Sequence, residues 1–118
     1  MSEFQVYSVS YKGLPAYHEA IYVEMSQAGG FLYHVIGDNL SGYRYEKRAT
    51  NGPERSESFS HKVYKGKVAN SDLSTFEAIC RDTPPPRHQV IHGVTFEKDC
   101  RHWVLDALKK LREAHVLR

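Results

Sequence analysis

The fold is decided by the stretch HEAIYVEMSQAGGFLYHVI, residues 18–36. In its first half, Ile21 and Val23 alternate with His18 and Tyr22, which is typical of a β-strand with two different faces. Gly29-Gly30 then predicts a tight turn into residues 31–36, an almost fully apolar run typical of a central strand covered on both faces. We therefore expect a hairpin that places His18 and His34 on adjacent strands.

Outward from this hairpin, the same patterns predict further elements. Alternation predicts strands at residues 4–11, 43–48 and 59–68, and Gly13-Leu14-Pro15 predicts a turn after the first of them. Apolar residues at helical spacing predict a short helix at residues 73–81 and a C-terminal helix from Asp99 onward. Residues 88–96 fit either a short strand or a buried loop, and we favour the strand. The fold class is therefore α+β, with a curved, mostly antiparallel sheet of about five strands packed against the C-terminal helix.

The size and composition of the chain indicate how many domains it has, where it is located and whether its cysteines are bonded. A chain of 118 residues with 41% hydrophobic and 25% charged residues fits a single domain spanning residues 1–118. We find no secretory leader and no apolar run long enough for a membrane span, so we expect a cytoplasmic protein without a membrane span. In that compartment, Cys80 and Cys100 are expected to remain thiols.

Cys100 is the strongest functional clue, because it falls in the first turn of the C-terminal helix, after Asp99 as a possible N-cap. It shares an apolar stripe with Val104, so its thiol should point toward the sheet. A helix N-terminus favours a nearby thiolate. His18 and His34 could then act as its base and as an orienting group. Spacing alone also allows the plainer interpretation that these are packing residues.

Two segments resemble a known family. Asp99-Cys100-Arg101-His102-Trp103-Val104 resembles the Asn-Cys-Glu-His-Phe-Val motif of the lecithin:retinol acyltransferase family, with Asp99 in place of Asn. Residues 18–23, HEAIYV, resemble that family's first catalytic strand. The order of His, His and then Cys at the head of a helix is that of circularly permuted papain-like enzymes related to NlpC peptidases. The whole chain is also similar to small fungal proteins of this superfamily.

The resemblance implies a cysteine-dependent acyl-transfer enzyme, either a thiol hydrolase or an acyltransferase, with Cys100 as nucleophile, His18 as base and His34 as orienting group. The substrate would be a small molecule or peptide carrying an amide, ester or thioester, and no cofactor is needed. A different class stays open, in which a cleft lined by Tyr11, Tyr22, Tyr33 and Trp103 binds or cyclises a small molecule without covalent catalysis.

Two other classes are less well supported. No Cys-x-x-Cys or His-Glu-x-x-His motif is present, so we expect no metal site. Basic residues near tyrosines could form a patch for single-stranded nucleic acid, but such residues more often form a solvated sheet face, and the net charge of +2 is small. We therefore expect no nucleic acid partner. The basic residues in question are Arg44, Lys47, Arg48, Lys62, Lys65 and Lys67.

Overall fold

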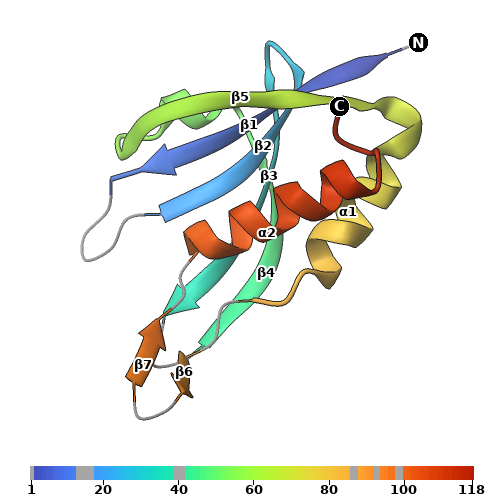
Figure 1. Ribbon diagram of the computed structural model, residues 1–118. Helices are drawn as coiled ribbons and strands as arrows, with labels where there is room; N and C mark the ends of the chain where they lie inside the picture. The colour runs from blue at the N-terminus through green and yellow to red at the C-terminus, as the bar shows by residue number, and fades with distance from the viewer. Residues whose placement is uncertain (1, 13–17, 39–41, 86–87, 92–93, 98–99) are drawn as a thin grey trace.

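The computed structural model describes residues 2–12, 18–38, 42–85, 88–91, 94–97 and 100–118 (Figure 1). The expected turn at Gly13-Leu14-Pro15 and the expected N-cap at Asp99 lie outside these residues. The described strands are β1 (Glu3–Tyr11), β2 (His18–Ser26), β3 (Gly29–Asp38), β4 (Gly42–Thr50), β5 (Phe59–Ala69), β6 (His88–Ile91) and β7 (Val94–Glu97). The α-helices are α1 (Leu73–Asp82) and α2 (Cys100–Glu113), and the short 3-10 helices are η1 (Pro53–Arg55) and η2 (Asn70–Asp72).

The main sheet has five strands in the order β4-β3-β2-β1-β5, and each neighbouring pair is antiparallel. The expected α+β fold with an antiparallel five-stranded sheet is thereby confirmed. The segment that fitted either a strand or a loop forms a separate hairpin of β6 and β7. The basic residues of β4 and those of β5 lie on strands at opposite edges of the main sheet.

The two faces of the sheet are covered differently. Both helices pack on one face, where α2 crosses the strands (Figure 1). The main core lies between them and includes Ile21, Tyr33 and Val35 of the sheet together with Trp103 and Val104 of α2. This core confirms the C-terminal helix as amphipathic, because the apolar stripe that contains Val104 is the buried one.

A second, smaller core lies on the other face of the sheet. It contains Val9, Tyr11, Ala20, Tyr22 and Leu32. These residues occupy the strand positions between those of the main core, as expected when successive side chains point to opposite faces. Even-numbered positions of β2 and β3 therefore face away from α2.

The C-terminal residues cover the free edge of β5. Lys67 and Arg118 exchange two backbone hydrogen bonds, with N–O distances of 2.8 and 3.0 Å. Gly66 has φ +143°, and a Cβ at this position would meet the backbone of Arg118. Pairing along this edge removes part of the exposed strand edge that could otherwise pair with another chain.

Cys80 and Cys100 are both free thiols, as expected. In the part of the chain that the structure describes, no helix is both long and apolar enough to cross a membrane.

We predict that Gly66→Ala lowers the free energy of unfolding by about 1–3 kcal/mol, because an alanine must adopt a positive φ and its methyl group meets the Arg118 backbone. The matched control is Gly42→Ala, which also has a positive φ, +89°, but has nothing within 4 Å of the added methyl group. Urea unfolding of both variants measures the difference. Equal losses in the two variants would contradict the role of the Arg118 contact.

Candidate active site

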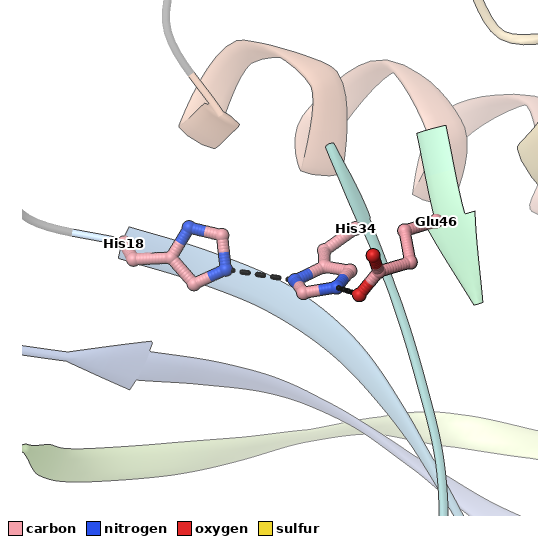
Figure 2. A network of polar contacts seen from close by, with 3 residues as sticks. All are labelled: His18, His34 and Glu46. Atoms are coloured by element: carbon pink, nitrogen blue, oxygen red, sulfur yellow. Dashed lines mark hydrogen bonds and ion pairs between the residues drawn. The ribbon is translucent and has the colours of Figure 1, made fainter. Parts of the chain in front are cut away.

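A chain of three hydrogen-bonded side chains crosses β2, β3 and β4 (Figure 2). His18 Nε2 lies 2.9 Å from His34 Nδ1, and His34 Nε2 lies 3.1 Å from Glu46 Oε1. We call these residues the His-His-Glu relay. The expected proximity of His18 and His34 on adjacent strands is present in the structure, and Glu46 is an additional member that the sequence did not single out.

Strand register explains why these three residues meet. Glu46 is the Cα partner of His34 across β3 and β4. On the other side, Ile21 pairs with Tyr33 and Tyr22 with Leu32, so continuing this register brings His34 opposite Ala20, two residues from His18. Because side chains alternate along a strand, all three relay residues point away from α2.

The relay fixes the tautomers of both imidazoles. An ionised carboxylate only accepts hydrogen bonds, so the Nε2 of His34 must carry the proton that it donates to Glu46. In a neutral ring, the Nδ1 of His34 is then an acceptor for the Nε2–H of His18. The Nδ1 of His18 is left with a lone pair. In Figure 2 this nitrogen points away from His34, on the side of the view where the first turn of α2 lies.

Burial keeps both imidazoles neutral at pH 7. It is the main cause that lowers the pKa of His18 to about 4, and His34 contributes further. Burial also lowers the pKa of His34, although the hydrogen bond and the charge of Glu46 partly oppose this effect. His34 is only 5% exposed. Both imidazoles of the relay are therefore uncharged at neutral pH.

Cys100 begins α2 and is buried. Its sulfur accepts a hydrogen bond from the backbone N–H of Glu19, at an N–S distance of 3.3 Å. The nitrogen of Glu19 belongs to the peptide group that joins it to His18, so the sulfur lies against the backbone next to His18. Hydrogen bonding to sulfur and the positive end of a helix both favour the thiolate.

The thiol and the relay approach β2 from different directions. Cys100 belongs to the helix on one face of the sheet, whereas the His18 ring shares the other face with Tyr11, against which it stacks at 5.9 Å between ring centroids. His18 is the first residue of β2, so the two groups meet at the start of that strand. A separation of about 4 Å or less between the Cys100 sulfur and the His18 ring stays a prediction.

A cavity of about 580 Å³ opens on the relay face of the sheet. Residues of the sheet form one side of the cavity. Residues of the segment that connects β4 to β5 form the other side. Its described lining consists of Tyr11, His18, Leu32, His34, residues 48–53, Arg55, Ser56 and Ser58. Both histidines of the relay thus line this cavity.

The expected aromatic cleft needs correction, because its four residues do not share one face. Tyr11 lines the cavity, and Tyr22 is buried beside Tyr7 on the same face. Tyr33 and Trp103 are buried in the main core between the sheet and α2. The alternation of β3 places Tyr33 and His34 on opposite faces, which excludes Tyr33 from a cleft that contains the relay.

Groups of three or more His, Cys, Asp or Glu side chains that could hold a metal ion do not occur among the residues that the structure describes.

We predict that the imidazole of His18 titrates with a midpoint near pH 4, which NMR of the ring carbons can measure. The folded pKa lies below the ordinary value of 6.5, so the unfolded chain binds a proton first as the pH falls. Stability from this residue should be complete above pH 6.5 and lost between about pH 6.5 and pH 4, by on the order of 2 kcal/mol.

The variant His18→Gln should flatten the dependence of melting temperature on pH in this range. The matched control is His61→Gln, which changes an exposed histidine of β5. A His18 midpoint near 6.5, or equal effects of the two variants, would contradict the burial of a neutral relay.

Comparison with known proteins yields a family match that contains the whole site. No curated protein and no solved structure matches the chain. One family model does match, over residues 6–118, and its description is a family of unknown function, DUF6540. Because this match includes all three relay residues and Cys100, the site described above lies within the matched region. The chain belongs to the DUF6540 family.

Proposed function

We propose that this protein is a cysteine-dependent acyl-transfer enzyme, a thiol hydrolase or acyltransferase that acts on an amide, ester or thioester. The observation that carries the proposal is the contact of the Cys100 sulfur with the N–H of Glu19, directly after His18, combined with the His-His-Glu relay. Glu46 and His34 orient the imidazole of His18 so that its Nδ1 keeps a lone pair. This arrangement provides a nucleophile, a base and an orienting chain.

In the first half-reaction, His18 Nδ1 takes the proton of the Cys100 thiol and the sulfur attacks the substrate carbonyl carbon. The resulting thiolate also favours the protonated imidazole, which offsets the burial that otherwise lowers the pKa of His18. The positive end of α2 stabilises the oxyanion of the tetrahedral intermediate. The intermediate then expels an amine, alcohol or thiol, which takes the proton from His18.

In the second half-reaction, water attacks the thioester on Cys100 while His18 accepts a proton from it. The carbon–sulfur bond breaks, the sulfur regains a proton from His18, and a carboxylic acid leaves. An amine or alcohol in place of water yields a transferred acyl group. The same residues therefore serve hydrolysis and transfer, and the nature of the acceptor decides between them.

Cys80 provides an internal control for this proposal. It is fully buried, and burial together with the charge of Glu77 raises the pKa of its thiol to about 12. Cys80 therefore stays protonated and inaccessible at neutral pH. Cys100 is also buried, but it lies at the helix start and its sulfur accepts a hydrogen bond from the N–H of Glu19.

We predict that iodoacetamide labels Cys100 much faster than Cys80 at pH 7, and that p-nitrophenyl acetate leaves one acetyl group on Cys100. His34→Gln should slow both reactions by about tenfold or more without changing the melting temperature greatly, because the base loses its orienting partner. Peptide mapping by mass spectrometry measures both modifications. Cys80→Ala is the matched control and should retain them.

Three outcomes would contradict the proposal. Acetylation that persists in Cys100→Ala would show that another residue reacts. Equal labelling of the two cysteines would show that Cys100 is not activated. An unchanged alkylation rate in His34→Gln, accompanied by a loss of stability of about 1–3 kcal/mol, would assign His34 to packing.

A further inference from the structure

Two arginines line the cavity without a carboxylate partner among the residues that the structure describes. Arg48 comes from the end of β4, and Arg55 comes from η1. Neither forms an ion pair with a described residue. By comparison, Lys47 pairs with Glu77 at 3.3 Å and Lys62 pairs with Glu54 at 2.7 Å.

The nearby acidic side chains are already engaged. Glu46 accepts the hydrogen bond of His34, and Glu54 is held by Lys62. No Asp or Glu occurs among the described residues that line the cavity. With both histidines neutral, the two guanidinium groups give the described lining a formal charge of +2.

Strand register places one of these charges beside the relay. Arg48 is the Cα partner of Leu32, so its side chain shares the face of Leu32, His34 and Glu46. Its positive charge adds to the burial that lowers the pKa of His34, and it partly opposes the burial and the charge of Glu54 that raise the pKa of Tyr11. An anion bound to Arg48 would therefore lie within the same cavity as the base.

The remainder of the lining suits the same kind of ligand. Ser56 and Ser58 place their hydroxyl oxygens 3.0 Å apart, and Thr50 and Asn51 add further polar side chains. Leu32 and Pro53 provide apolar surface. Arginine forks bind the planar oxygens of carboxylates and phosphates by two parallel hydrogen bonds, and hydroxyls can donate to the same oxygens.

We propose that this cavity binds an oxyanion group, a carboxylate or a phosphate, through Arg48 and Arg55, and that this group belongs to the acyl substrate. The assignment to a substrate rests on the proposed function above. The anionic group binds under the segment that connects β4 to β5, and the reactive carbonyl lies toward His18 and the start of α2. Substrates that lack the anion would lose this contact and bind less tightly.

The experiment measures binding separately from catalysis, by isothermal titration calorimetry on the full chain carrying Cys100→Ala. The probes are hippurate, which carries a carboxylate, and phenyl phosphate, with N-benzoylglycinamide as the neutral counterpart of hippurate. We expect at least one of the two anions to bind at least about tenfold more tightly than the neutral amide. Preference for hippurate or for phenyl phosphate would distinguish a carboxylate substrate from a phosphate ester.

Arg48→Gln and Arg55→Gln should each weaken anion binding by about tenfold or more. Arg44→Gln is the matched control, because it removes the same charge from an exposed position of β4 that does not line the cavity. Circular dichroism verifies that each variant is folded. Equal effects of all three variants would show that binding depends only on the net charge of the protein, and would overturn the assignment.

Failure of this inference differs from failure of the proposed function. Saturable binding of neither anion, or equal binding of hippurate and its amide, overturns the anion site even if Cys100 becomes acetylated. Selective anion binding that depends on Arg48 and Arg55 supports the anion site even if Cys100 is unreactive. In that second case the cavity is a binding pocket without acyl transfer.

Discussion

The site depends on the hydrogen bond between His18 and His34, which joins β2 to β3 at a distance of 2.9 Å. It forms only if the two strands pair in the observed register, because a slip of one residue would turn one imidazole toward the opposite face. The next pairing, of His34 with Glu46, extends the same constraint to β4. Three strands thus determine the tautomer and direction of a single imidazole, that of His18.

The opposite face of the sheet holds Cys100 in place. α2 is fixed by the main core, and its Trp103 donates a hydrogen bond to the carbonyl of Thr83 at the end of α1, at 3.2 Å. The first residue of this anchored helix is Cys100, whose sulfur reaches the backbone of β2. The sheet therefore separates a packed face, which positions the thiol, from an open face, where His18 and His34 line a cavity.

Much of this arrangement could be predicted from sequence, because alternation and helical spacing report which residues share a face within one element. This logic located β1 to β5, α2, His18, His34 and Cys100, but it did not divide residues 88–96 into the paired strands β6 and β7. It missed Glu46, because pairing between strands depends on turns and packing that a single sequence does not report. It also placed Tyr33 and Trp103 in a cleft, although both serve the core. The pattern around Arg48 favoured a solvated sheet face and Arg55 was not singled out, whereas the structure places both in the lining of the cavity, one from β4 and the other from η1.

We infer that the Cys100 sulfur and the His18 imidazole act as one unit at the start of β2. A crystal structure of the unmodified protein would measure the distance from Cys100 Sγ to His18 Nδ1. We expect a distance of about 4 Å or less, as for a nucleophile and its base in the absence of substrate. A distance of more than about 8 Å, with the relay intact, would contradict it.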